Sequence, residues 1–136
     1  MKKLIIFMIC FIVIILLTGC GNSTNKQTIL CRGIITEEGM TYQEEITAAI
    51  ENEIIVKVSN KTIYETKDDA KAVCEVYKLS NKNSKGSDKI NYKCNGNAIE
   101  IKNYENVFNQ MGINVKNTYV DEFIILMNDR GLTCYK

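Results

Sequence analysis

The side chains best suited to covalent chemistry in this 136-residue chain are its six cysteines. A thiol can attack an electrophile, bind a metal, form a thioether or pair as a disulfide. The chain contains no histidine, so it lacks the imidazole that activates most serine and cysteine nucleophiles and often binds zinc. Neither glycine-rich phosphate-binding pattern, GxxxxGK[ST] or GxGxxG, occurs. A site based on lysine or carboxylate side chains is the alternative, but no spacing points to one, so we expect no catalytic, cofactor-binding or metal-binding residue.

The first two cysteines lie at the front of the chain. Met1-Lys2-Lys3 precedes a run of fourteen apolar residues, 4–17, which contains Cys10, and Cys20 follows the run closely. A basic start followed by a short apolar run and small residues is the layout of a secretory signal. A membrane-spanning helix needs about 20 apolar residues, so an uncleaved signal anchor is the alternative interpretation.

The segment Leu17-Thr18-Gly19-Cys20 resembles the lipobox of bacterial lipoproteins. The resemblance implies that a diacylglycerol is attached to the Cys20 thiol and that the signal peptide, residues 1–19, is removed. It also implies that the new amine can receive a further acyl chain such as palmitate. Two or more acyl chains hold a protein stably on a bilayer. The partner implied for Cys20 is therefore membrane lipid, on the extracytoplasmic face of the cell membrane.

The remaining chain divides into a tether and one domain. Residues 20–27 are mostly small and polar, which is typical of a flexible linker, and residues 28–136 have the length of a single small domain. Because Lys2 and Lys3 leave with the signal peptide, 15 basic side chains remain against 16 acidic ones. A nucleic-acid-binding domain is usually strongly basic, so we expect no nucleic-acid partner.

The domain keeps four cysteines, and an even number in a small extracytoplasmic domain usually means disulfides. No CxxC pattern occurs, which argues against a thioredoxin-type redox motif or a zinc knuckle. Four cysteines allow three pairings, and four buried free thiols are the alternative. The four are Cys31, Cys74, Cys94 and Cys134.

The local pattern around two of these cysteines ranks the pairings. Thr66 followed by Asp69 predicts the capped start of a helix, and Cys74 falls on its apolar stripe together with Ala70, Val73 and Tyr77. Asn95-Gly96 predicts a hairpin turn, and its first strand places Cys94 on the same face as Ile90 and Tyr92. Both thiols are thus expected to point inward. We expect Cys74 to pair with Cys94, which leaves Cys31 for Cys134.

Three strands are expected before this helix. Residues 28–36 are rich in β-formers, Glu37-Glu38-Gly39 predicts a turn, and residues 40–50 alternate, with Glu44 the one polar residue on the apolar face. That face would hold Tyr42, Ile46, Ala48 and Ile50. After a turn at Asn52, the third strand would place Ile54, Val56 and Val58 together. Near Asn60 the alternation of apolar residues along this strand shifts by one position, so we expect a bulge there.

The end of the domain is expected to be helical. After an irregular stretch, Thr118 would cap a second helix, with Asp121 three residues on, and Gly131 would end it. The predicted order is β-β-β-α-β-β-α. This is an α+β fold in which an antiparallel sheet of about five strands carries two helices on one face. Two disulfides cross-link the fold.

This order on a lipobox resembles the YehR-like family of small bacterial lipoproteins. The likeness rests on Cys31-Arg32-Gly33, the segment ENEIIVKV (51–58), the segment ETKDDAKAVCEVYK (65–78) and the closing residues 130–134. The resemblance implies a surface-held domain of unknown activity, and it supplies no catalytic residue.

Three sets of side chains could contact a partner. The lysines could meet an anionic polymer or headgroups, the glutamates could hold a hard cation, and the tyrosines could line a sugar- or peptide-binding face. The alternatives are a solvated loop, a solvated sheet edge and half-buried strand residues. The sets are Lys78, Lys82, Lys85, Lys89 and Lys93; Glu37, Glu38, Glu44, Glu45, Glu51 and Glu53; and Tyr42, Tyr64, Tyr92, Tyr104 and Tyr119.

The expected function is a lipid-anchored, non-enzymatic domain that binds an unknown protein or polymer of the cell envelope. The alternative is a small disulfide-stabilised inhibitor or protective protein that blocks a wall-directed hydrolase.

Overall fold

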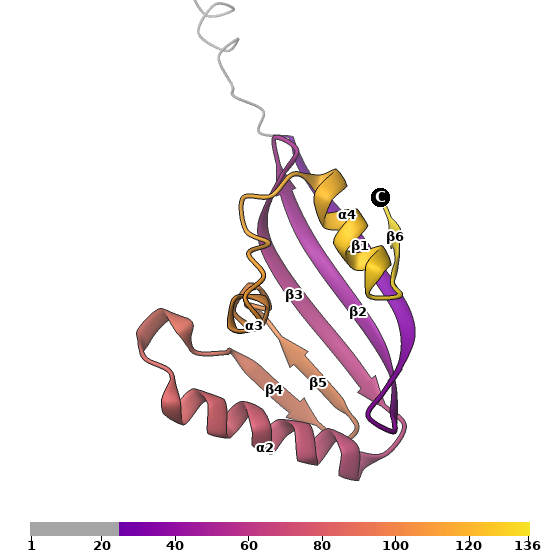
Figure 1. Ribbon diagram of the computed structural model, residues 1–136, viewed down its shortest axis with the longest axis vertical. Helices are drawn as coiled ribbons and strands as arrows, with labels where there is room; N and C mark the ends of the chain where they lie inside the picture. Colours follow the sequence, from indigo (N-terminus) through magenta and orange to yellow (C-terminus); the bar gives the residue numbers. More distant parts are fainter. Residues whose placement is uncertain (1–24) are drawn as a thin grey trace, which may run out of the picture.

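In the computed structural model, which describes residues 25–136, the chain forms one antiparallel sheet with helices on one face (Figure 1). The predicted signal peptide and Cys20 lie outside the described residues. The α+β class is as predicted, although the sheet has six strands rather than about five and carries three α-helices rather than two.

The six strands pair in the order β4-β5-β3-β2-β1-β6. Each neighbouring pair is antiparallel. The first strand begins at Lys26, earlier than the expected domain start at residue 28. The bounds are β1 Lys26–Glu37, β2 Met40–Glu51, β3 Ile54–Tyr64, β4 Tyr92–Asn95, β5 Ala98–Ile101 and β6 Thr133–Tyr135.

Strands β1 to β3 form a meander that makes up the centre of the sheet. Both connecting turns have two residues, and all four of these residues have positive φ: Glu38, Gly39, Asn52 and Glu53. Turns of this kind match the right-handed twist of the strands they join. The predicted turn positions at residues 37–39 and at Asn52 are therefore confirmed. The hairpin of β4 and β5 turns at Gly96 and Asn97, one residue later than predicted.

The predicted bulge near Asn60 is wrong. Instead, the register of β2 with β3 shifts between Ala49 and Ile50, close to the turn that joins these two strands. Val56 is left without a partner there. A bulge inserts one extra residue and moves all later side chains to the other face.

The predicted inward face of β3 is therefore wrong at its start. Ile55 is fully buried, whereas Ile54 and Val56 are only half-buried. Beyond the bulge the inward positions are Val58, Asn60, Thr62 and Tyr64.

The first long helix, α2 (Lys67–Asn83), begins where the sequence predicts. The Thr66 hydroxyl accepts a hydrogen bond from the backbone N–H of Asp69 at 3.1 Å, which satisfies one of the free donors of the first turn. The helix packs on β3, β4 and β5 at one end of the sheet (Figure 1). Only Ala70 on it is buried, while Val73, Cys74 and Tyr77 are half-buried.

The C-terminal part differs from the prediction in three ways. Helix α3 (Glu105–Gln110) lies in the stretch expected to be irregular, and the three-residue strand β6 was not expected. Helix α4 (Val120–Asp129) is present, but its cap residue is Tyr119 and not Thr118, whose hydroxyl donates to the Val115 carbonyl at 2.6 Å. The helix ends close to Gly131, which has a φ of +85°, as predicted.

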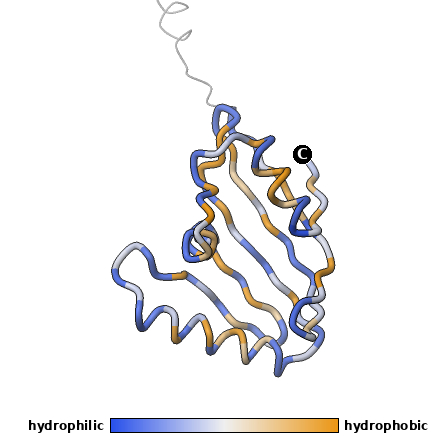
Figure 2. Tube along the Cα trace, viewed as in Figure 1, coloured by the Kyte–Doolittle hydropathy of each residue, from blue (hydrophilic) through white to orange (hydrophobic). Residues whose placement is uncertain are grey.

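The core lies between the sheet and the helices. Residues that alternate toward the helices are buried, whereas no strand residue on the opposite face is buried. Figure 2 shows the same alternation as hydrophobic and hydrophilic segments along the central strands. One face of the sheet is therefore open to solvent, which antiparallel sheets allow.

Candidate functional site

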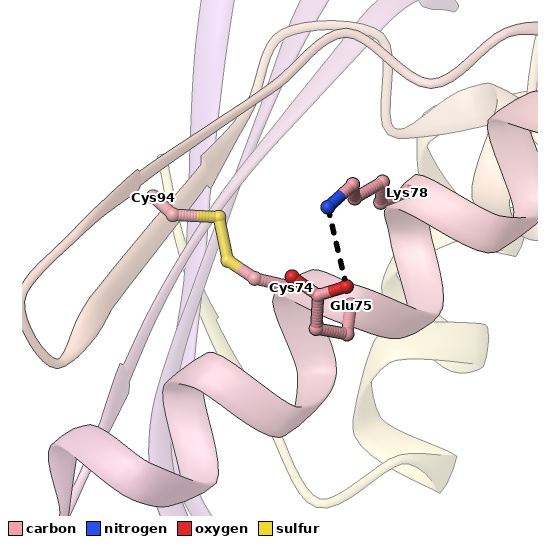
Figure 3. The surroundings of a disulfide bond; sticks show 4 residues. All are labelled: Cys74, Glu75, Lys78 and Cys94. Atoms are coloured by element: carbon pink, nitrogen blue, oxygen red, sulfur yellow. Dashed lines mark hydrogen bonds and ion pairs between the residues drawn. A yellow bond between two sulfur atoms is a disulfide. The ribbon is translucent and has the colours of Figure 1, made fainter.

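The four cysteines of the domain form the two predicted disulfides. Cys31 lies directly opposite Cys134 in the register of β1 with β6 and bonds to it. Cys74 of α2 bonds to Cys94 of β4, as Figure 3 shows beside Lys78 and Glu75 of the same helix. Cys94 lies opposite the buried Ile99 in the register of β4 with β5, so it faces α2 as predicted, although it is exposed at the edge of the sheet and Cys74 is half-buried. This second disulfide therefore ties α2 to the rim of the sheet.

The centre of the helix-covered face holds a buried carboxylate. Glu44 of β2 is only 2 % exposed. Its Oε1 accepts hydrogen bonds from Asn60 Nδ2 at 3.0 Å and from the Tyr104 hydroxyl at 2.9 Å. Asn60 in turn accepts a hydrogen bond from Thr62 at 3.0 Å. Burial of a carboxylate is costly unless it is hydrogen-bonded and paired, and this network supplies the hydrogen bonds.

Arg130 supplies the charge partner. Its Nη2 lies 3.4 Å from Oε2 of Glu44, and its guanidinium also stacks over the ring of Phe108 at 5.3 Å. Burial alone would lower the pKa of Arg130, but the Glu44 carboxylate together with Tyr104 and Tyr42 outweighs it, and the pKa is raised above its ordinary value. Arg130 is therefore held as a cation against the buried acid.

Gly33 makes room for this arrangement. It pairs with Glu44 in the register of β1 with β2, and a Cβ atom placed on it would lie 2.6 Å from the Gly131 carbonyl oxygen and 3.2 Å from Leu132. The absence of a side chain at Gly33 therefore lets the turn after α4 approach the sheet. This approach brings Arg130 within reach of Glu44.

Four tyrosines surround the network. The rings of Tyr42 and Tyr64 lie 5.4 Å apart across β2 and β3, and Tyr77 of α2 and Tyr104 complete the set. Burial, reinforced by the Glu44 carboxylate, raises the pKa of Tyr42 to about 12. Burial also raises the pKa of each of the other three. A neutral phenol donates a hydrogen bond, so these groups stay donors around the acid.

A hollow of about 290 Å³ leads to the edge of this network. It is lined by Ile35, Thr36, Glu37, Tyr42 and Arg130. The Nε atom of Arg130 is buried and has no hydrogen-bond partner among the described residues. A water molecule or another acceptor in this hollow would satisfy it.

The predicted sets of contact residues have different outcomes. Tyr42, Tyr64 and Tyr104 come together around Glu44, while Tyr92 stacks with Tyr77 at 5.8 Å and Tyr119 lies apart at the start of α4. The glutamates separate to both faces of the sheet. Within residues 25–136 no three potential metal-ligating side chains lie close enough to hold an ion.

The open face of the sheet carries a row of alternating charges. The strand registers place Arg32 opposite Glu45, Glu45 opposite Lys61, and Lys61 opposite Glu100, which in turn faces Lys93. Opposite charges on facing residues of neighbouring strands are mildly stabilising and help to set the register.

The lysine-bearing loop between α2 and β4 is held in place by asparagines. Asn81 exchanges two hydrogen bonds with the backbone of Ile90, at 2.7 and 2.8 Å. Asn103 accepts from the backbone of Asn91 and donates to that of Lys89, and Asn106 donates to the carbonyls of Ser87 and Lys89. All five lysines of the predicted basic rim are exposed: Lys78, Lys82, Lys85, Lys89 and Lys93.

The roles of Glu44 and Arg130 do not follow from the local sequence pattern. The only local sign was an acidic residue on an otherwise apolar strand face. A buried acid needs a cationic partner, and the cation lies in the turn after α4, far away in the sequence.

Comparisons of the chain with protein-family models, with curated proteins and with solved structures found no match. None of the helices within residues 25–136 is both long enough and apolar enough to cross a membrane.

Proposed function

We propose that this chain is a lipid-anchored extracytoplasmic lipoprotein whose folded domain binds a component of the cell envelope without catalysing a reaction. The observation that carries the proposal is the complete pairing of the domain's four cysteines in two disulfides. Disulfides persist in oxidising compartments outside the cytoplasm. Neither disulfide uses Cys20, the residue to which the lipobox resemblance assigns the lipid.

The open sheet face supports a binding function over the alternative of an enzyme inhibitor. A blocking protein of this size requires a rigid loop that projects a side chain into its target. The loop at residues 84–91 is instead held by hydrogen bonds to Asn81 at the end of α2, to Asn103 and to Asn106. A broad exposed face is the surface that a binding domain requires.

The location is tested by fractionating cells that express the full chain. We expect the protein to sediment with membranes, to be released by detergent, and to expose the domain's four thiols to alkylation only after reduction. Recovery in the cytosolic fraction with four free thiols would contradict the proposed location.

The binding role is tested by capture from envelope extracts with the detergent-solubilised full chain. The control is the same protein after reduction and alkylation. We expect a reproducible envelope component that the control does not retain, and equal retention by both forms would contradict specific binding.

A further inference from the structure

A hollow lies beside the loop between α2 and β4 that the asparagines hold in place. It has a volume of about 560 Å³, within the range of roughly 300–1,000 Å³ of sites for small ligands. The end of α2, the loop and α3 form its walls. The lining residues are Asn83, Ser84, Lys85, Asp88, Asn106, Asn109 and Gln110.

The lining consists of polar and charged residues and is electrically balanced. It contains no aliphatic or aromatic residue, and its one lysine and one aspartate offset each other. A ligand with several neutral hydroxyl or amide groups matches the lining, because hydroxyls and side-chain amides each donate and accept hydrogen bonds.

Several of these polar groups are not used by the fold. The side chains of Asn83 and Asn109 make no hydrogen bond within residues 25–136. Gln110 uses only its Oε1, which accepts from Ser80 at 3.1 Å, so its Nε2 is free. Asn106 uses its Nδ2 to hold the loop and keeps its Oδ1 free. By contrast, the side-chain amides of Asn81 and Asn103 use both their oxygen and their nitrogen to hold the loop. These two amides serve the fold, whereas the others remain available to a ligand.

The hollow is also rigid and well placed. Its loop wall is fixed by three asparagine side chains, and a fixed wall reduces the entropy lost on binding. In Figure 1 the described chain starts at the top, next to the turn between β2 and β3, whereas α2 ends and the loop lies at the opposite lower left. A domain tethered through its first strand would present this hollow away from the membrane.

We propose that this hollow binds a carbohydrate chain of the cell envelope through the free amides of Asn83, Asn109 and Gln110. The inference rests on the proposed function and names the ligand class. Without an aromatic platform for the sugar rings, single chains bind weakly, with a dissociation constant on the order of 1 mM. The exposed lysines around the loop favour a polyanion as the competing ligand, and the experiment separates the two.

The experiment is an NMR titration of the full chain in neutral detergent micelles. The probes are chitotetraose, which carries acetamido groups, maltotetraose, which carries only hydroxyls, and inorganic polyphosphate. Each sugar is added to about 20 mM in chains and polyphosphate to about 20 mM in phosphate units, well above the ~1 mM dissociation constant expected for a single chain. We expect saturable shifts of the side-chain amides of Asn83, Asn109 and Gln110 with at least one neutral sugar. The difference between the two sugars shows whether acetamido groups or hydroxyls are recognised.

Variants test the assignment. The double change Asn83→Ala and Asn109→Ala should weaken sugar binding about tenfold, since it removes two or more hydrogen bonds. Asn128→Ala, at an exposed position on α4, is the matched control and should leave binding unchanged. If the double variant does not fold, the residues that shift in the unaltered chain still decide the site.

Three results would overturn the inference: no shift with either sugar, shifts that map outside the hollow, or binding of polyphosphate alone that salt abolishes. Membrane sedimentation and thiol protection are measured separately. A failure of sugar binding is therefore distinguishable from a failure of the proposed function.

Discussion

Arg130 and Glu44 are 86 positions apart in the chain, yet their side chains meet at 3.4 Å beneath the helices. The contact joins the turn after α4 to the middle of the sheet. Gly33, opposite Glu44, leaves the space in which this turn sits. The last segment of the domain is thus fixed twice, by this ion pair and by the disulfide from Cys134 to Cys31.

Removal of the cation should destabilise the domain. Arg130→Met keeps the apolar stem but leaves the Glu44 carboxylate buried without a charge partner. Loss of one member of a buried pair typically costs 3–5 kcal/mol, and because the Arg130 side chain is 23 % exposed we expect about 3 kcal/mol. Denaturant unfolding measures the change. Arg32→Met, at an exposed arginine stacked on Tyr135, is the control and should cost less than about 1 kcal/mol.

The loss should be partly recovered when the acid is also neutralised. Glu44→Gln keeps an acceptor for Asn60 and Tyr104 but removes the charge. We expect the double variant with Arg130→Met to be more stable than Arg130→Met alone. If the double variant is less stable by the full sum of the two single losses, Glu44 and Arg130 do not act as a pair.

Gly33→Ala should destabilise the domain by displacing the turn after α4. The added Cβ would lie 2.6 Å from the Gly131 carbonyl oxygen, so the turn must move, at a cost of about 1–3 kcal/mol. Because the movement also separates Arg130 from Glu44, the effects of Gly33→Ala and Arg130→Met should not add. A double-mutant cycle measures the coupling, and strict additivity would show that Gly33 does not position Arg130.

The Cys31–Cys134 disulfide can be removed by replacing either of its two cysteines, and the stabilities of the two variants can then be compared. Its loss should cost about 4–5 kcal/mol by the loop-entropy estimate. Cys31 is fully buried and Cys134 is half-buried, so Cys31→Ser also buries a hydroxyl, at a further ~1–3 kcal/mol. We expect Cys31→Ser to unfold at lower denaturant than Cys134→Ser, and equal midpoints would contradict the burial difference.

The tyrosines around Glu44 should make the domain sensitive to alkali. Their pKa values are raised in the folded state, to about 12 for Tyr42, against about 10 in an unfolded chain. The folded state therefore holds their protons more tightly, and this stabilisation is complete below pH ~10 and is lost as the pH rises toward the folded pKa. Unfolding free energy measured against pH should fall above pH ~10 and fall less steeply in Tyr42→Phe. An identical slope would show that Tyr42 contributes nothing to this dependence.

Local patterns allowed much of the fold to be predicted. The capped start of α2, the two central turns and the end of α4 depend on neighbouring residues, and each was found from its sequence pattern. The disulfide pairing was also correct, because Cys94 shares the face of Ile99 that α2 covers, although its place at the edge of the sheet leaves it exposed. The two cysteines lie 20 residues apart, across the single connection from α2 to β4.

The rest depends on contacts between distant parts of the chain. Strand β6 has only three residues and exists because β1 pairs with it, and the bulge at Val56 is set by the pairing of β2 with β3. Glu44 was an exception in an apolar pattern until Arg130 was placed beside it. The hollow beside α3 combines residues from two helices and a loop, which no single segment could indicate.

The most direct test of the lipid-anchored function is the intact mass of the full chain purified from bacterial membranes. We expect a chain that begins at Cys20 and carries a diacylglycerol on its thiol, with one further acyl chain if the amine is modified, while Cys20→Ala retains residues 1–19 and no lipid. A purified chain that keeps residues 1–19, or begins at Cys20 without a lipid adduct, would contradict the anchor and with it the proposed function.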